Sequence, residues 1–327
     1  MGTKLKDAVV VVTGASSGIG RATVKGLLQV GSTVVAVARR EQALQDLAQE
    51  VDGSTRERLH VEALDVTDAA AVERLAKDTV GRFGRLDAWV NNAAVNQYGR
   101  FEELPLDEWK RVVEVNLFGY ANGARAALPW FREQGHGVLV NVGSVLSKVP
   151  APLQSAYVAS KYAIRGLTES LRQETQDAKG IGIALIMPGP VDTPLFQHAA
   201  NRTGKRVKPP EPTVDATRVA AAIIKNLKHP RREVPVSAAT RPALFFMKVL
   251  PGTTERVAAK AMAASHLTDE AEAPTAGNLF EPVPAGISVS GGWKPSRAGH
   301  PGRTLAIVGG VGAAAAATAV GLKKRAA

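Results

Sequence analysis

The chain of 327 residues is 45% hydrophobic, which is enough to bury a large core and excludes an intrinsically disordered protein. It has no cysteine, so disulfides, thiolate nucleophiles and cysteine-ligated zinc are excluded, and no metal site is predicted. The net charge is +11, but six basic residues lie after Glu281, beyond which no acidic residue follows. Most of the basic excess therefore belongs to the C-terminal segment. Because nothing resembles a zinc finger or an aromatic and basic RNA platform, nucleic-acid binding is not expected.

The beginning of the chain has no long apolar stretch of the kind that forms a secretory signal. Lys4, Lys6 and Asp7 lead directly into the first predicted strand. We therefore expect a cytoplasmic protein.

Six apolar runs bounded by turn residues predict strands that are buried on both faces of a sheet. These runs are Ala8–Thr13, Thr33–Ala38, Leu59–Asp65, Leu86–Asn91, Gly137–Val142 and Ile181–Met187. Helical patterns fill the intervals, and this alternation predicts a parallel sheet covered on both faces through right-handed crossovers. With an edge strand at Arg232–Ser237, the predicted fold class is α/β, a doubly wound Rossmann sheet of about seven strands that binds a dinucleotide.

Residues 1–266 are predicted to form this one domain, including a helical extension over residues 241–266. The extension carries an apolar cluster at residues 244–250, which either packs in the core or closes a pocket. Residues 267–303 are rich in Pro, Gly, Ser and Ala and predict a flexible linker.

Residues 304–327 form an Ala/Gly-rich apolar tail with a basic end. Its stretch Leu305–Leu322 has eighteen uncharged residues, and a helix of that length would span about 27 Å, close to the thickness of a bilayer core. Two hypotheses remain open: membrane contact through residues 304–325, or a disordered or docked tail.

A glycine-rich turn joins the first predicted strand to the first predicted helix, where free backbone N–H groups favour a pyrophosphate. Its glycines are expected to allow the tight turn, the approach of the cofactor and close helix–strand packing, in that order. The predicted cofactor contacts in this turn are Gly14, Ser16, Ser17, Gly18, Ile19 and Gly20.

The end of the second strand usually decides which dinucleotide is held, because a carboxylate there bonds the ribose 2′-hydroxyl and repels a 2′-phosphate. Here the strand is followed by Arg39 and Arg40, whose guanidinium groups suit a phosphate. NADP(H) is therefore predicted in preference to NAD(H), the alternative being that both arginines are merely solvated.

Two further strand ends carry candidate cofactor contacts. Asp65 and Val66 close the third strand, where Asp65 either reaches the adenine or caps the next turn. Asn92 and Ala93 end the fourth strand, with either a cofactor-binding or a structural role.

Four side chains predict the catalytic machinery. Tyr157 and Lys161 lie four residues apart on one helix face, and Ser144 lies at the mouth of the fifth strand. A phenol with a pKa of about 10 is a weak acid at neutral pH, so Lys161 is expected to lower the pKa of Tyr157 while Ser144 holds a substrate carbonyl. Asn116, in the middle of an apolar helix, either anchors a water that connects Lys161 to solvent or is a satisfied packing residue.

These motifs resemble the short-chain dehydrogenase/reductase family over roughly residues 5–240. The resemblance implies that the turn at residues 14–20 binds the cofactor and that Asn116, Ser144, Tyr157 and Lys161 are catalytic. It also implies nicotinamide-side contacts from Pro188, Gly189, Val191 and Thr193, and a homodimer or homotetramer. Ala94 and Gly143 depart from the common pattern, but neither change removes a catalytic group.

The leading hypothesis is an NADP(H)-dependent oxidoreductase acting on a small-molecule ketone, aldehyde or secondary alcohol. The apolar cluster, together with Leu195 and Phe196, suggests a lipophilic substrate. A non-catalytic dinucleotide-binding sensor or scaffold is the alternative. A nucleotide-sugar epimerase or dehydratase is disfavoured, because it would need a different glycine spacing and a larger substrate domain.

Overall fold

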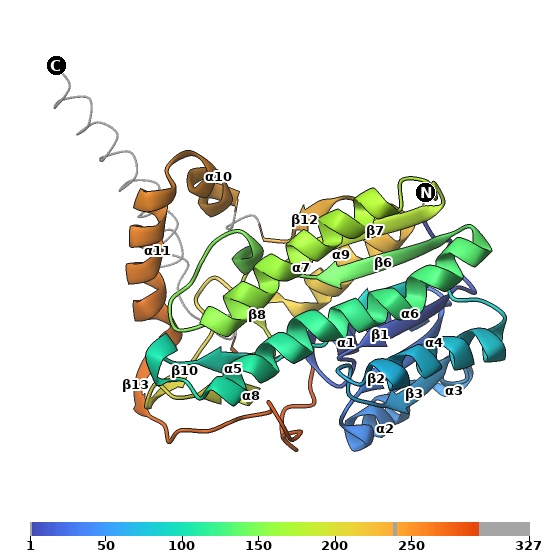
Figure 1. Ribbon diagram of the computed structural model, residues 1–327. Coiled ribbons are helices and arrows are strands. Elements are labelled where there is room, and N and C mark those ends of the chain that lie inside the picture. Colours follow the sequence, from blue (N-terminus) through green and yellow to red (C-terminus); the bar gives the residue numbers. More distant parts are fainter. Residues whose placement is uncertain (1, 238–240, 294–327) are drawn as a thin grey trace.

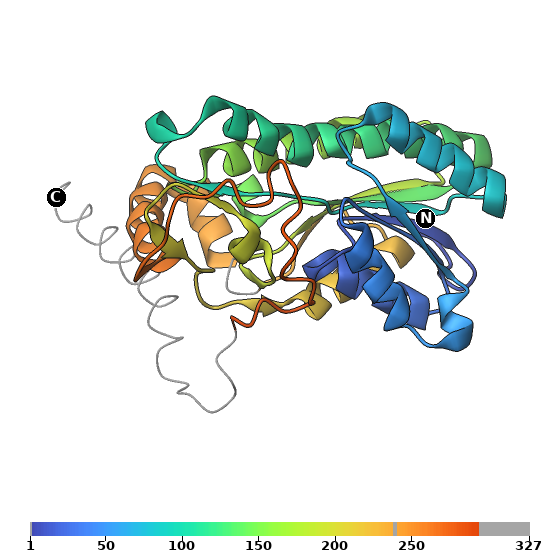
Figure 2. The ribbon, with the colours of Figure 1, turned by 90° about the horizontal axis from the view of Figure 1, so that it is seen from below.

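The computed structural model describes residues 2–237 and 241–293. Its centre is a parallel sheet with helices on both faces (Figure 1). Seen from below, the helices form one layer above the sheet and one below it (Figure 2). The predicted α/β doubly wound architecture is confirmed.

The main sheet has seven strands in the order β12-β7-β6-β4-β1-β2-β3, and every neighbouring pair is parallel. The strand order reverses between β1 and β4, which is where such sheets open a crevice for a ligand. The strands are β1 (Val9–Thr13), β2 (Thr33–Ala38), β3 (Leu59–Ala63), β4 (Ala88–Asn91), β6 (Gly137–Val142), β7 (Ile181–Met187) and β12 (Glu233–Pro235).

The central strands are almost entirely buried, as their uninterrupted Val, Ile and Ala runs predict for strands covered on both faces. One face is covered by α4 (Ala69–Phe83), α5 (Leu106–Val113), α6 (Gly119–Gln134) and α7 (Ser155–Glu174). The other face is covered by α1 (Gly18–Gln29), α2 (Glu41–Gln49) and α9 (Ala216–Lys228). Shorter elements are α3 (Gly53–Arg56), α8 (Leu195–His198), η1 (Phe101–Glu103), η2 (Glu114–Phe118), η3 (Val145–Ser147), β5 (Gln97–Tyr98), β8 (Val191–Asp192), β9 (Ala200–Asn201) and β11 (Val214–Asp215).

After the sheet, α10 (Arg241–Val249) and α11 (Pro251–His266) form a helical pair, in agreement with the predicted extension. The apolar cluster at residues 244–250 neither lines the cavity described below nor packs in the core: none of its residues is buried, and Phe245 is 61% exposed.

The structure differs from the predicted flexible linker over residues 267–293. Residues Leu267–Ala271 form strand β13, which pairs antiparallel with β10 (Lys205–Val207). Residues 275–293, which we call the C-terminal strap, then run along the underside of the domain (orange-red in Figure 2). A composition rich in Pro and Gly did not prevent this order, because arginine, aspartate and backbone groups of the main domain satisfy the strap's own backbone.

The predicted apolar tail, residues 304–327, lies outside the described residues. Within the described ranges, no helix combines the length and apolarity needed to cross a bilayer.

Candidate active site

The glycine-rich turn connects β1 to α1, as predicted. At Gly20 an added Cβ atom would lie 2.1 Å from the Gly14 carbonyl oxygen, so only glycine permits this packing. Asn92 braces the turn by donating to the carbonyl oxygens of Thr13 (3.0 Å) and Gly14 (3.3 Å). Asn92 thus has a structural contact and also borders the cavity above the turn.

One cavity runs from this turn to Tyr157, along the carboxyl ends of the strands. Of the site residues predicted from the sequence, all but Gly20 and Asn116 line it. The lining includes Ser144, Tyr157 and Lys161 of the catalytic set, Arg39 and Arg40 after β2, and Pro188, Gly189, Val191 and Thr193 around β8. The fold therefore brings together groups that are far apart along the chain.

Lys161 is held in place by backbone and aromatic contacts. Its Nζ donates to the Val142 carbonyl oxygen at 2.9 Å and lies 5.3 Å from the centre of the Tyr157 ring. The side chain is only 2% exposed, and burial lowers the pKa of Lys161 to about 7 because the charged form loses its water. The ammonium therefore titrates near neutral pH.

Tyr157 and Ser144 face the cavity from α7 and the end of β6. Burial raises the pKa of the Tyr157 hydroxyl, and hydrogen bonding by Ser144 opposes this rise in part. The sequence predicts the opposite net direction, a pKa lowered by Lys161. The difference arises because burial disfavours the charged form of both groups at once.

Asn116 lies on a turn of π-helix, η2, between α5 and α6. Its side chain accepts from the Val95 N–H (2.9 Å) and donates to the Val95 carbonyl (3.0 Å) and the Ser160 hydroxyl (3.1 Å). These hydrogen bonds satisfy both polar atoms of the side chain and connect α7 to the loop after β4. Of the two readings left open by the sequence, the geometry matches the satisfied packing residue.

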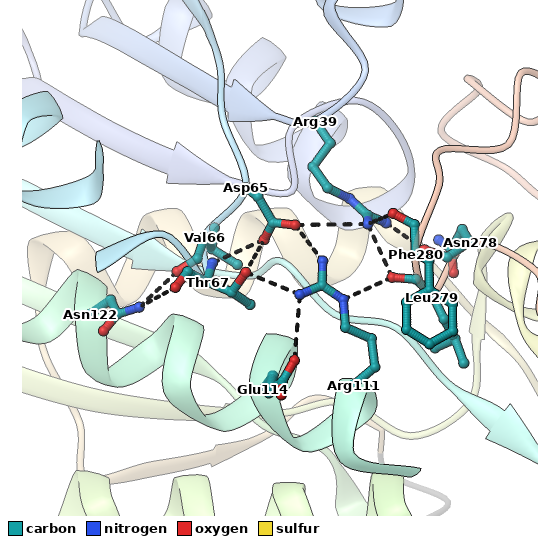
Figure 3. Close-up of polar contacts among 10 residues, drawn as sticks. All are labelled: Arg39, Asp65, Val66, Thr67, Arg111, Glu114, Asn122, Asn278, Leu279 and Phe280. Atoms are coloured by element: carbon teal, nitrogen blue, oxygen red, sulfur yellow. Dashed lines mark hydrogen bonds and ion pairs between the residues drawn. The ribbon is translucent and has the colours of Figure 1, made fainter. Parts of the chain in front are cut away.

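Asp65 resembles a turn cap more than a cofactor ligand. It accepts from the Thr67 N–H at 2.9 Å and the Thr67 hydroxyl at 2.8 Å. Its other oxygen forms an ion pair with Arg111, and Arg39 lies 3.9 Å away (Figure 3). These bonds lower the pKa of the carboxyl group against the effect of burial.

The two arginines after β2 are bonded to the C-terminal strap. Arg39 donates to the carbonyl oxygens of Asn278, Leu279 (3.1 Å) and Phe280 (2.9 Å) (Figure 3). Arg40 donates in the same way to three carbonyls further along, those of Val283, Ala285 and Gly286. Burial lowers the pKa of both guanidinium groups. The alternative of two solvated arginines does not agree with these contacts.

Further contacts hold the strap to the rim of the cavity. The Ser288 carbonyl accepts from the Gly18 N–H at 3.0 Å. Asp192 accepts from Ser290, Gly291 and Trp293, all within 3.0 Å. At Gly286, where φ is +70°, a Cβ atom would lie 2.2 Å from His198 Nε2. The strap is therefore closely packed and forms one wall of the cavity through Asn278, Pro282 and Val283.

Several lining residues were missed by the sequence reasoning. Asn96 and Tyr98 follow the Asn-Asn-Ala motif directly, and Gln154 precedes the helix of Tyr157, so their positions next to known motifs were an available signal. His266 and the strap residues carry no such signal, because nothing local indicates that they return to the cavity.

The profile of the short chain dehydrogenase family matches residues 8–203. The chain belongs to this family. It is therefore a nucleotide-dependent dehydrogenase/reductase that acts on CH–OH groups of small molecules.

The chain is 34% identical over 306 residues to the uncharacterized oxidoreductase YxnA of Bacillus subtilis, covering 90% of this chain and 84% of that protein. It is also 34% identical over 205 residues to the mouse dehydrogenase/reductase SDR family member 7B, covering 62% and 63% of the two chains. Among solved structures, a short-chain dehydrogenase from Streptomyces avermitilis superposes with a TM-score of 0.65 at 31% identity, covering 77% of this chain and all of that one. An alcohol dehydrogenase from Thermococcus sibiricus, solved with 5-hydroxy-NADP, gives a TM-score of 0.60 at 28% identity over 70% of this chain and 95% of its own.

Proposed function

We propose that this protein is an NADP(H)-dependent carbonyl reductase or alcohol dehydrogenase whose proton donor is Tyr157. The observation that carries the proposal is the shared cavity, in which Ser144, Tyr157 and Lys161 meet the glycine-rich turn and the two arginines. A bound nicotinamide supplies or accepts the hydride, and the cavity lining has the residue types that such a cofactor requires.

In the direction of reduction, Ser144 donates a hydrogen bond to the substrate carbonyl oxygen while Tyr157 transfers its proton to that oxygen. Lys161 holds a charge beside Tyr157 when protonated, which favours loss of the phenolic proton. In the direction of oxidation the same groups run in reverse, with Tyr157 accepting the proton of the alcohol.

The preference for NADP(H) rests on the charges at the end of β2. Asp65 is the one carboxylate among the described residues that line the cavity, and Thr67 and Arg111 already occupy it. The hydrogen bonds of Arg39 and Arg40 to the strap go to neutral carbonyl oxygens, which are weaker partners for a guanidinium than a phosphate, and the ion pair of Arg39 with Asp65 is long at 3.9 Å. A 2′-phosphate would replace some of these carbonyls. The Thermococcus sibiricus relative, solved with 5-hydroxy-NADP, supports this choice by analogy.

The substrate is proposed to be a lipophilic ketone, aldehyde or secondary alcohol, since Val145, Leu195 and Phe196 line the same cavity as the proposed catalytic groups. The test follows consumption of NADPH and NADH by the purified protein with a panel of aldehydes, ketones and quinones. Turnover with NADPH at a clearly higher kcat/KM than with NADH supports the proposal. Equal use of both cofactors contradicts the preference, and tight NADPH binding without any turnover favours the sensor alternative.

A dimer or tetramer and a membrane contact through residues 304–325 remain proposals. The exposed Phe118, which lies between α5 and α6, is consistent with self-association. Light scattering after size exclusion tests the first, and sedimentation with vesicles, before and after truncation at His300, tests the second.

A further inference from the structure

The catalytic end of the cavity contains a cluster of buried polar side chains beyond the predicted set. Asn96, Tyr98, Gln154 and His266 all line the cavity with Tyr157, and each is at most 4% exposed. They come from three separate parts of the chain: Asn96 and Tyr98 lie at β5, Gln154 directly precedes α7, and His266 ends the helical extension. Buried polar groups are normally paired, so any unpaired ones here point to a ligand.

Two consecutive hydrogen bonds determine which ring nitrogen of His266 carries the proton. Asn96 donates to Gln154 Oε1 at 2.9 Å, so the other atom of the Gln154 amide is its NH₂ group. That group lies 3.3 Å from His266 Nε2, which must then accept. Burial lowers the pKa of His266 to about 4, so the ring is neutral at pH 7 and carries its proton on Nδ1. This Nδ1–H makes no hydrogen bond of normal geometry, although the Lys208 backbone lies near enough to raise the pKa of the ring in part.

The Tyr98 hydroxyl is the second unpaired group. It is fully buried and makes no hydrogen bond, although the Asn96 amide lies near enough to oppose the rise of its pKa. Tyr98 and His266 are in ring contact, with centroids 5.7 Å apart. Tyr98 and the proposed proton donor Tyr157 line the same cavity, and repulsion from Tyr157 also raises the pKa of Tyr98.

The charges around this cluster restrict what it can bind. Among the described lining residues the permanently charged groups are Arg39, Arg40 and Asp65. All three follow β2 or β3, which β1 and β4 separate from β6 and Ser144. Adjacent strands lie about 4.8 Å apart, so the arginines are on the order of 14 Å from the catalytic end. Among the described lining residues, Lys161 is the one lysine or arginine side chain nearer to this end, and it is bonded to the Val142 carbonyl oxygen.

We propose that Tyr98 and His266 form a hydrogen-bonding site for a neutral oxygen of the substrate, a hydroxyl, ester or second carbonyl group adjacent to the carbonyl that reacts. This inference rests on the proposed function and narrows its substrate class to hydroxyketones, diketones and keto esters. Keto acids should be poor substrates, because a carboxylate would be buried beside a neutral imidazole while Lys161, the nearer cation in the lining, is already bonded to the Val142 carbonyl oxygen.

The test compares ketones that share a phenyl group. Acetophenone lacks the second oxygen, α-hydroxyacetophenone and methyl benzoylformate carry a neutral one, and benzoylformate carries a charged one. Steady-state kcat/KM is measured with NADPH for the wild type and for Tyr98→Phe and His266→Phe. Tyr162→Phe and His229→Phe are matched controls, because both side chains are exposed. Thermal unfolding and NADPH affinity of each variant show whether it folds and binds cofactor.

We expect Tyr98→Phe to lower kcat/KM for the two neutral oxygenated ketones by about tenfold, with acetophenone changed less than twofold. We expect His266→Phe to act in the same direction, the controls to have no effect, and benzoylformate to be the poorest substrate of the wild type. Tyr98 and His266 are removed in separate variants, so if one variant fails to fold, the other still tests the site.

Equal losses with acetophenone and α-hydroxyacetophenone would overturn the site, because the hydroxyl of the substrate would then not be the partner. A selective loss in Tyr98→Phe alone would overturn the role of His266 and assign its Nδ1–H to the adjacent Lys208 backbone, which also acts on its pKa. Efficient turnover of benzoylformate would overturn the restriction to neutral substrates. Failure of the proposed function would give a different result. The wild type would then show no oxidation of NADPH with any of the carbonyl compounds.

Discussion

At the catalytic end of the cavity, Ser144, Tyr157 and Lys161 come from the end of β6 and from α7, and the parts of the chain that hold them are close in sequence. At the arginine end, Arg39 and Arg40 meet carbonyl groups 239 to 246 residues further along the chain. The first end depends on the core of the domain, and the second depends on a strap added outside it. Catalysis and cofactor exchange should therefore respond separately to mutation.

The largest effect is expected at the catalytic end. Tyr157→Phe removes the proposed proton donor without changing its shape, so kcat should fall roughly 10²- to 10⁴-fold while NADPH affinity is kept. Stopped-flow turnover and a fluorescence titration measure the two quantities, with Tyr162→Phe as control. Full activity of Tyr157→Phe would show that another group supplies the proton.

A pH dependence of stability is expected from Lys161. Its pKa is 10.5 as an ordinary lysine and about 7 in the folded protein, so between these values the unfolded chain binds more protons. Stability from this group is therefore lowest below pH 7 and rises with pH, by roughly 1.4 kcal/mol per pH unit. Urea denaturation from pH 7 to about 9 should show this rise in the wild type and not in Lys161→Met. Parallel curves for the two proteins would refute it.

At the arginine end, Arg39→Ala should weaken NADPH binding by roughly tenfold, because a charged hydrogen bond contributes about 1.5–3 kcal/mol. NADH binding should change much less. Calorimetric titration with both cofactors measures this difference. Lys25→Ala is the matched control, since this cation lies on the surface and pairs with Glu50. An equal loss for both cofactors would mean that Arg39 acts only by holding the strap.

The smallest effect is expected on the Kd of NADPH when the C-terminal strap is deleted. Truncation after Pro274 deletes the strap together with the tail, whereas truncation after Trp293 deletes the tail alone. Because the strap walls the cavity, we expect both association and dissociation of NADPH to become about tenfold faster in the first truncation only, with Kd nearly unchanged. Rates that match in the two truncations would show that the strap does not control cofactor exchange.

The features of the fold and of the site differ in how far the sequence alone could predict them. The glycine-rich turn and the Tyr157/Lys161 pair were predictable because local geometry dictates them: a strand-to-helix turn, and two side chains one helical turn apart. The seven strands were predictable because apolar runs of that length are buried on both faces in a parallel sheet.

The apparent linker is the clearest failure of the local reading. Its Pro- and Gly-rich composition has no periodicity, which normally indicates flexibility. The structure satisfies its carbonyl groups with Arg39 and Arg40 and its N–H groups with Asp192. Such pairing depends on side chains far away along the chain, and a local pattern cannot encode it.

By itself, the sequence determined the fold class, the glycine-rich turn between the first strand and the first helix, and the placing of Tyr157 and Lys161 on one helix face, because each depends on residues close together in the chain. Tertiary structure alone decided that the strap binds the arginines, that His266 returns to face Tyr98, and that burial shifts the pKa of Tyr157 upward and that of Lys161 downward. The physical reason is that hydrogen bonding, desolvation and charge interactions depend on distance in space. Long connections between the strands bring together residues that are far apart in the sequence, so these effects cannot be read from neighbouring residues.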